Sequence, residues 1–369
     1  MSSAPRGLRI SIILVALAVL AAGAVVAQTV VGRRDAATLS AAGTGTVAKG
    51  LAVGNAMSFM SEAQLDRLMS DAAAAGVTSV RGDFSWRLVQ AGGRTAYDWA
   101  QTDRIVEAAN RHGVGLLPIL TETPDWARRL LCVVPGACPP RDPDDFARFA
   151  RAAAERYAPL GVRAWEIWNE PNLARFWAVP NPLGYGRLFV AAQSAITSVD
   201  PGATVLLGGL AGGATLIGGG LDPRPFLRGV CLLTSACRVA SGLAYHPYTD
   251  GTLPSKTNQL SAWAKISRTT PSLRSVLADS GVPDLPIWLT EVGAPTGSNN
   301  VVPNYVTESV QAQIVQDAYA TARTEPGVVS LYWYSYRDEP GLVGAEAFFG
   351  LKRADGSPKP AWQAFVDVR

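Results

Sequence analysis

The chain has 369 residues, of which 48% are hydrophobic and 17% are charged, and its formal net charge is +3. This composition suits a globular chain, and one barrel of ordinary size would use most of it. The basic excess is small and the arginines form no stripe interleaved with aromatic residues, so we expect no nucleic-acid partner.

The first 31 residues are predicted to serve in export. Arg6 and Arg9 precede an apolar run from Ile10 to Val31, which as a helix would be about 33 Å long, enough to span a bilayer. The small residues before Gln28 also resemble a signal-peptidase site, so an uncleaved anchor and a cleaved signal both stay open. In either case we expect an extracytoplasmic protein, secreted or attached to the membrane only through residues 1–31.

The rest of the chain divides into a linker and one domain. Residues 32–46 are rich in Ala, Gly, Thr and Ser without a period, which predicts a flexible linker. Over residues 47–369, short β-rich runs alternate with helical stretches. Eight βα units predict an α/β chain folded as a (β/α)8 TIM barrel. A doubly wound open sheet is the alternative, but no G-x-G-x-x-G follows the first strand. The strands are expected within 47–57, 78–84, 114–121, 163–170, 204–210, 242–248, 285–292 and 328–336.

The four cysteines fall into two local pairs, Cys132/Cys138 and Cys231/Cys237. In an exported protein such pairs predict small disulfide-closed loops, with four separate buried thiols as the alternative. A loop that short would contribute roughly 2–3 kcal/mol. Neither pair has C-x-x-C spacing and the chain has only two histidines, so we expect no metal and no cofactor.

Two of the predicted strands end in a glutamate. In the segment R-A-W-E-I-W-N-E-P-N, Pro171 disfavours helical backbone at Glu170, which places its carboxyl at a strand end. We expect Trp165 and Trp168 to give this carboxyl an apolar setting. The segment L-P-I-W-L-T-E-V-G places Glu291 at the end of the seventh strand. Paired carboxylates without metal ligands around them are typical of glycoside hydrolysis, although such residues can also simply solvate turns.

The paired motifs W-N-E-P and W-L-T-E-V-G resemble the clan A retaining glycoside hydrolases, especially families 5 and 39, over roughly residues 47–369. The resemblance implies cleavage of O-glycosidic bonds in an extracellular or cell-envelope oligo- or polysaccharide. Glu170 would be the general acid/base and Glu291 the nucleophile, with carboxyls roughly 5–5.5 Å apart, whereas roughly 8 Å would indicate inversion. We expect a monomer. The alternatives are a transglycosylase that uses the same residues and a surface-tethered carbohydrate-binding pseudo-enzyme.

A buried arginine is expected beside these carboxylates. Arg81 and Asp83 share one face of the second strand, and Glu166 shares the parity of Glu170 on the fourth strand. Because a buried carboxylate needs a partner, Arg81 is predicted to pair with Glu166. The resemblance places Arg81 beside Glu291 instead, where its charge would lower the pKa of that carboxyl. Both contacts can occur together.

Three more polar residues are assigned to the sugar by the resemblance. Asn169 matches the family asparagine that bonds the 2-hydroxyl of the sugar. His246 and Tyr248, from Y-H-P-Y at the end of the sixth strand, match residues beside the nucleophile. A purely structural histidine is the alternative for His246.

Three tryptophans complete the predicted site. The resemblance makes Trp333 on the eighth strand the platform on which the sugar stacks, with core packing as the alternative. Trp126 and Trp177 would line further subsites or anchor loops. The third strand ends in T-E-T-P-D-W where family 5 usually has a histidine, which favours family 39.

Overall fold

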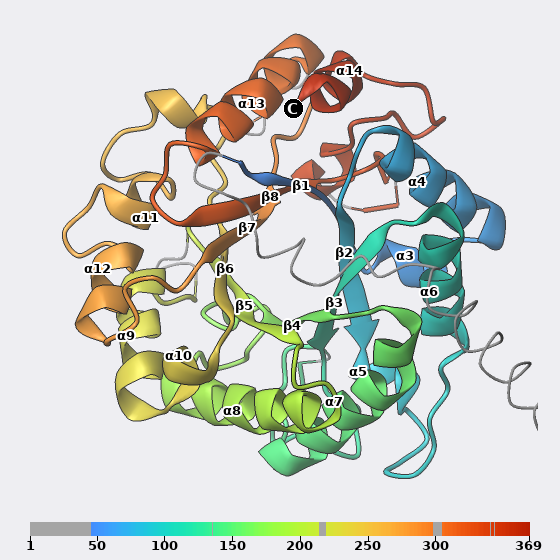
Figure 1. Cartoon of the computed structure of the whole chain (residues 1–369), viewed down its shortest axis with the longest axis vertical. Coiled ribbons are helices and arrows are strands. Elements are labelled where there is room, and N and C mark those ends of the chain that lie inside the picture. Colours follow the sequence, from blue (N-terminus) through green and yellow to red (C-terminus); the bar gives the residue numbers. More distant parts are fainter. Residues whose placement is uncertain (1–45, 135, 214–218, 298–304, 340, 343) are drawn as a thin grey trace, which may run out of the picture. The chain divides into compact units, whose positions relative to one another are not determined.

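A computed structural model describes residues 46–134, 136–213, 219–297, 305–339, 341–342 and 344–369. In these residues the strands form one closed parallel barrel in chain order, surrounded by helices (Figure 1). The predicted (β/α)8 barrel is therefore confirmed. The strands are β1 Ala48–Gly54, β2 Ser79–Ser85, β3 Gly115–Thr121, β4 Ala164–Asn169, β5 Thr204–Ala211, β6 Gly242–His246, β7 Ile287–Val292 and β8 Val328–Tyr334.

One main helix follows each strand. These helices are α4 Glu62–Ala74, α6 Ala100–His112, α7 Pro143–Tyr157, α8 Pro182–Val199, α9 Pro223–Leu233, α12 Leu273–Asp279, α13 Glu308–Ala322 and α14 Pro360–Asp367. Shorter helices lie in the connections: α3 Ala56–Phe59, α5 Trp86–Val89, α10 Ala236–Val239 and α11 Ala264–Ser267. Three helices start alike, because α7, α8 and α9 each follow an Asp or Asn whose side chain accepts a backbone N–H, with proline next. This sequence both caps the helix and presets its first φ angle.

The alternation of side chains along the strands separates an interior from an outer apolar layer. Residues such as Leu51, Trp165 and Leu331 face the helices and form the main hydrophobic core. The interior is narrowed by Tyr332, whose hydroxyl lies 2.6 Å from the Ser79 Oγ of β2. Since the base of the barrel is filled in this way, the carboxyl ends of the strands are left as the place for a site.

The structure has two disulfides, and they lie at opposite ends of the barrel. Cys132–Cys138 closes a loop in the β3–α7 connection, at the carboxyl ends of the strands. Cys231–Cys237 joins the end of α9 to α10 just before β6, at the amino ends. All four cysteines are thereby paired.

The predicted export segment and nearly all of the predicted linker lie outside the described residues. Among the residues that the structure describes, no helix combines the length and the apolar character that a membrane crossing requires. The domain boundary near residue 47 and the choice between anchor and cleaved signal therefore stay predictions.

Candidate active site

The carboxyl ends of four strands bring polar side chains together at one end of the barrel. They come from β2, from the end of β4, from β6 with the loop that follows it, and from β7. Seven of these side chains are linked by hydrogen bonds or ion pairs: Arg81, Glu166, Asn169, Glu170, His246, Tyr248 and Glu291. All seven were singled out from the sequence.

Arg81 is fully buried, and its hydrogen bonds connect the residues of β4 with Glu291 on β7. Its Nε and Nη2 donate to the two carboxylate oxygens of Glu166, each at 2.7 Å. Its Nη1 donates to Glu291 Oε1 at 2.6 Å, and its Nη2 also donates to Asn169 Oδ1 at 2.9 Å. The structural ion pair and the contact with Glu291 therefore occur together, and the arginine fixes the distance between β4 and β7.

Glu291 lies at the end of β7 with 14% of its side chain exposed. Besides the bond from Arg81, its Oε2 accepts a hydrogen bond from the Tyr248 hydroxyl at 2.8 Å and lies 3.7 Å from His246 Nδ1. Burial alone would raise the pKa of Glu291. The charges of His246 and Arg81, with the hydrogen bonds from Tyr248 and Arg81, outweigh burial and hold that pKa below its ordinary value. These contacts favour the ionised form of Glu291, the form that could act as a nucleophile.

The backbone at the end of β4 leaves regular strand geometry. Trp168 has φ 70° and Glu170 has φ 42°, a region that is strained for residues other than glycine. As a result Trp168 turns outward, where its ring centroid lies 5.9 Å from that of Phe146 and 5.3 Å from that of Trp177. Asn169 and Glu170, although adjacent, both reach the interior network. Strict alternation, assumed from the sequence, fails beyond residue 167.

Glu170 has a different setting from the one predicted. Trp165 and Trp168 belong to the helix-facing core, so the apolar setting expected from them is wrong. The Glu170 side chain is 12% exposed, and its one described side-chain partner is His246, whose Nδ1 lies 2.9 Å from Oε1. Arg81 Nη2 lies 3.3 Å from the other ring nitrogen, Nε2. Nη2 already donates both of its hydrogens, to Glu166 and Asn169. Nε2 also lies 3.1 Å from the Thr290 hydroxyl, and Nδ1 is the ring nitrogen directed at Glu170.

The two glutamates are close together. One carboxylate oxygen of Glu170, one of Glu291 and a ring nitrogen of His246 all lie within 4.8 Å of one another. An oxygen–oxygen approach this close favours the carboxyl separation of retaining glycosidases, roughly 5–5.5 Å, over the roughly 6.5–9.5 Å of inverting ones. Two carboxylates and an imidazole could also ligate a divalent cation. Here both oxygens of Glu291 already accept hydrogen bonds, and the Arg81 charge beside them opposes a second cation.

Two adjacent glycines in β5 make room for this arrangement. A Cβ on Gly209 would collide with the His246 ring, and one on Gly208 would collide with the backbone of β4. The Gly209 N–H donates to Glu166 Oε1 at 2.8 Å, and its carbonyl accepts the Glu170 N–H at 3.0 Å. These roles were not predicted. A G-G pair inside an otherwise apolar strand was the available signal, because it marks a close backbone approach.

Asp83 is a third carboxylate at this end of the barrel. It is partly exposed, and no side chain or backbone group in the described residues donates a hydrogen bond to it. Burial raises the pKa of Asp83 to about 7, against the lowering effect of the Arg81 charge and with the help of repulsion from Glu122 and Glu291. An acceptor without a protein donor is free to bind a hydroxyl group.

Relatives of known type match the chain over part of their length. No family model matches it. It is 28% identical over 230 residues to a beta-xylosidase of Geobacillus stearothermophilus, a match that covers 58% of this chain and 42% of that protein. It is 27% identical to a beta-xylosidase of Caldicellulosiruptor saccharolyticus, over 62% of this chain and 46% of that protein. The chain is similar to the clan A glycoside hydrolases. It spans less than half the length of these two relatives.

Solved structures share the fold. A family 39 glycoside hydrolase from Bacteroides cellulosilyticus superposes with a TM-score of 0.62 at 22% identity, covering 86% of this chain and 62% of the other. A monomeric beta-xylosidase from Caulobacter crescentus gives a TM-score of 0.66 at 20% identity, covering 87% and 67%. These likenesses establish the barrel. With the relatives above, they confirm the resemblance to the clan A glycoside hydrolases that the two glutamate motifs predicted.

In this barrel, Trp333 does not face the site. It is fully buried and belongs to the helix-facing core of β8, so its prediction as a sugar platform is wrong. The opposite face of β8 carries Tyr332 inside the barrel and Tyr334 at its end. Tyr334 is the partly exposed aromatic residue there, and burial raises its pKa, as does the charge of Glu291. Parity along β8 would have selected Tyr334, whereas residue type selected Trp333.

The other two tryptophans differ from each other. Trp177 is 2% exposed and packs between Trp168 and Tyr185, with ring centroids 5.3 and 6.0 Å away. It anchors the loop after β4, and its prediction as a subsite residue is wrong. Trp126 is partly exposed, and its indole N–H donates to the Gln90 carbonyl at 2.7 Å. A substrate contact by Trp126 stays a prediction.

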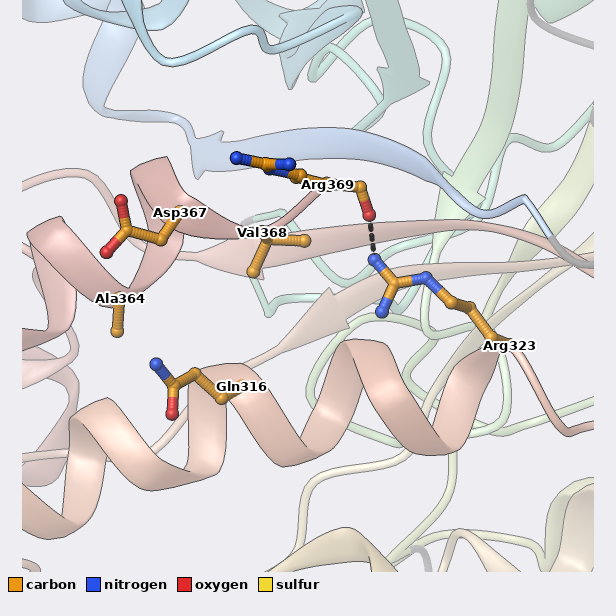
Figure 2. Close-up of a pocket in the computed structure, with 6 residues that line it drawn as sticks. All are labelled: Gln316, Arg323, Ala364, Asp367, Val368 and Arg369. Atoms are coloured by element: carbon orange, nitrogen blue, oxygen red, sulfur yellow. Dashed lines mark hydrogen bonds between the residues drawn. The ribbon is translucent and has the colours of Figure 1, made fainter.

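A pocket elsewhere on the barrel is separate from this site. It lies between α13 and α14 at the end of the chain, where the Arg323 guanidinium donates to the carbonyl of Arg369 (Figure 2). None of the hydrogen-bonded carboxylates lines it. Its lining residues are Gln316, Arg323, Ala364, Asp367, Val368 and Arg369.

Proposed function

We propose that the protein is an exported retaining glycoside hydrolase in which Glu170 is the general acid/base and Glu291 the nucleophile. The observation that carries the proposal is a pair of carboxylates with one oxygen of each within 4.8 Å of the other. Only the Glu291 carboxylate is bonded by a guanidinium and a phenol. A close pair with unequal surroundings is what a double displacement requires.

The reaction would proceed in two steps. In the first, the Glu291 carboxylate attacks the anomeric carbon while Glu170 gives its proton to the leaving oxygen, which forms a glycosyl–enzyme ester and releases the aglycone. In the second, the Glu170 carboxylate takes a proton from water as the water oxygen attacks the same carbon. The ester bond to Glu291 breaks, and Glu170 is protonated again.

The neighbouring residues would orient this chemistry. Arg81 and Tyr248 hold the two oxygens of Glu291 in place, so that the nucleophile needs little reorganisation. The bond from Arg81 to Asn169 Oδ1 fixes the orientation of that amide. Its NH2 group is thereby left to donate to a sugar hydroxyl, which supports the 2-hydroxyl contact implied by the resemblance. His246 would donate its Nδ1 hydrogen to Glu170 once that residue is ionised.

The names of the relatives suggest which substrates to try first. Both curated relatives are called beta-xylosidases, so aryl β-xylosides come first in the panel, followed by aryl glucosides, mannosides and furanosides. For any substrate that is turned over, proton NMR of the product first formed decides the mechanism. We expect the substrate's anomeric configuration to be kept. Inversion would contradict the double displacement, and no turnover across the panel would favour the carbohydrate-binding pseudo-enzyme.

Transglycosylation uses the same residues and is tested in the same assay. Adding an acceptor sugar at increasing concentration should leave the hydrolysis product dominant if water is the normal acceptor. A shift of nearly all product to the acceptor at low concentration would favour the transglycosylase.

Export is proposed from the predicted segment 1–31 and is supported by the two disulfides. An anchored protein should sediment with membranes and begin near Met1. Mature protein that begins at Gln28 in the culture fluid would show a cleaved signal. Protein found only in the cytoplasm with free thiols would contradict export.

A further inference from the structure

A group of exposed aliphatic side chains lies in the β3–α7 connection, at the same end of the barrel as the carboxylates. We call residues 130–134 the aliphatic finger. Its side chains Leu130, Leu131, Val133 and Val134 are 79%, 99%, 78% and 49% exposed. Single exposed aliphatic residues are ordinary, but a contiguous group marks a surface that binds something.

The base of the finger is fixed by a disulfide and by a backbone hydrogen bond. The disulfide Cys132–Cys138 closes the loop, and Cys138 is buried. Within this loop, the Ala137 carbonyl accepts the N–H of Ala178 at 2.8 Å, which connects the loop to the segment after β4. Val179, the next residue there, is also 77% exposed. The exposed apolar side chains of the finger therefore project from a cross-linked loop, and Val179 extends this apolar surface beyond the finger.

Two arginines flank the base of the finger. The backbone N–H of Arg129 donates to Pro139 and that of Arg141 to Ala127, so both are fixed in the same base. Their side chains are exposed, and neither forms an ion pair or hydrogen bond with any residue in the described part of the chain. The adjacent Arg128 differs, because it pairs with Asp125 at 3.2 Å. The finger thus combines an aliphatic tip with two free positive charges.

We propose that the aliphatic finger docks the barrel onto an anionic lipid surface. The tip would enter the boundary between headgroups and acyl chains, and Arg129 and Arg141 would bind headgroup phosphates. A glycan fits this surface less well, because sugars are bound by aromatic faces and polar groups, and the tip offers neither. The docking does not depend on the proposed catalytic function. It would bring the end of the barrel that carries Glu170 and Glu291 to a membrane.

The test places a fluorescent reporter on the tip. Leu131→Trp is made in the full chain, with Leu232→Trp as the control. Leu232 is 68% exposed and lies in the other disulfide-closed loop, at the opposite end of the barrel. Because the chain already has ten tryptophans, emission is read as the difference from wild type. The vesicles contain equal parts of phosphatidylglycerol and phosphatidylcholine, with and without brominated acyl chains.

We expect a blue shift and quenching by brominated chains for Leu131→Trp and neither for Leu232→Trp. The signal is local, so it reports on the finger whether or not residues 1–31 also bind the vesicle. Adding Val133→Asp to Leu131→Trp should abolish the quenching. Adding Arg129→Ser and Arg141→Ser should weaken it about fivefold for each arginine at low salt. Thermal unfolding followed by circular dichroism checks that each variant is folded.

Four results would overturn the proposal. They are an absence of quenching for Leu131→Trp, equal quenching of Leu232→Trp, equal quenching in pure phosphatidylcholine, and a blue shift without vesicles that grows with protein concentration. The last would show that a second copy of the chain covers the tip.

Discussion

The ends of β4 and β7 carry the same residue type in unlike surroundings. Glu170 and Glu291 are almost equally exposed, at 12% and 14%. Glu291 lies near the end of a strand without a positive φ angle and is bonded by Arg81 and Tyr248. Glu170 lies on backbone with positive φ, and its side chain contacts His246. The two carboxyls therefore differ in their hydrogen-bond partners and not in their burial. The groups that donate to each carboxyl would set its proposed role.

The His246 ring lies close to both Glu170 and Glu291. Its Nδ1 lies 2.9 Å from Glu170 and 3.7 Å from Glu291, and its Nε2 lies 3.1 Å from the Thr290 hydroxyl, next to Glu291 in the chain. A change at one glutamate should therefore be felt at the other.

The largest effect is expected at the end of β7. Glu291→Ala should lose activity on every substrate by at least about 10⁴-fold, because no other group can form the glycosyl ester. Azide should restore some turnover, and the azide product should have the inverted anomer. Rates on aryl glycosides and NMR of the azide product measure this. Glu107→Ala, an exposed glutamate on α6, is the matched control and should behave as wild type.

A smaller and substrate-dependent loss is expected at the end of β4. Glu170→Ala should slow natural glycosides by about 10²–10⁴-fold but keep much of the first step on aryl glycosides with acidic phenols. Without the base the glycosyl–enzyme should accumulate, so stopped-flow traces should show a burst of phenol. Azide should speed its turnover and give the retained anomer. Equal losses for both glutamates on all substrates, with no azide rescue, would make the assignment of roles wrong.

The sequence predicted the frame of this comparison and missed parts of its detail. The barrel, the strand-end positions of both glutamates and the pairing of Arg81 with Glu166 followed from the strand pattern, from parity and from the need of a buried carboxylate for a partner. The contact of Arg81 with Glu291 followed from the family resemblance. Parity failed at Trp168, because the local pattern does not reveal a positive φ. For the sugar platform on β8, Trp333 was selected because it is a tryptophan, and the parity of the strand was not considered. The close approach of Gly209 to His246 depends on how β5 and β6 pair. The sequence of either strand alone does not predict that pairing.

A moderate effect is expected when Glu291 loses one donor. Tyr248→Phe removes the hydroxyl that bonds Glu291 Oε2, one of the contacts that lower the pKa of Glu291. That pKa should rise, and because Glu291 acts when ionised, the acid limb of the kcat/KM profile should move to higher pH. Activity at neutral pH should fall about tenfold, as for the loss of a hydrogen bond to a charged group. Tyr97→Phe, whose ring stacks on Trp99 and whose hydroxyl does not bond Glu291, is the control. An unmoved acid limb would show that the phenol does not tune the nucleophile.

The smallest effect is on stability, and it concerns a carboxyl that has no donor. The pKa of Asp83 is about 7 against an ordinary 3.8, chiefly because of burial. Between these values the folded state keeps the proton that the unfolded state releases, so the free energy of unfolding falls as pH rises through this window. Asp83→Asn removes this loss. Relative to wild type, the variant should gain about 1–2 kcal/mol between pH 4.5 and pH 8, a figure reduced from the full shift because the carboxyl is partly exposed. Urea unfolding at both pH values measures the difference. Asp284→Asn, an exposed aspartate before β7, should show no such trend. If Asp83→Asn instead becomes relatively less stable at high pH, an unseen donor stabilises the ionised form, and Asp83 would resemble Glu291 more than its contacts indicate.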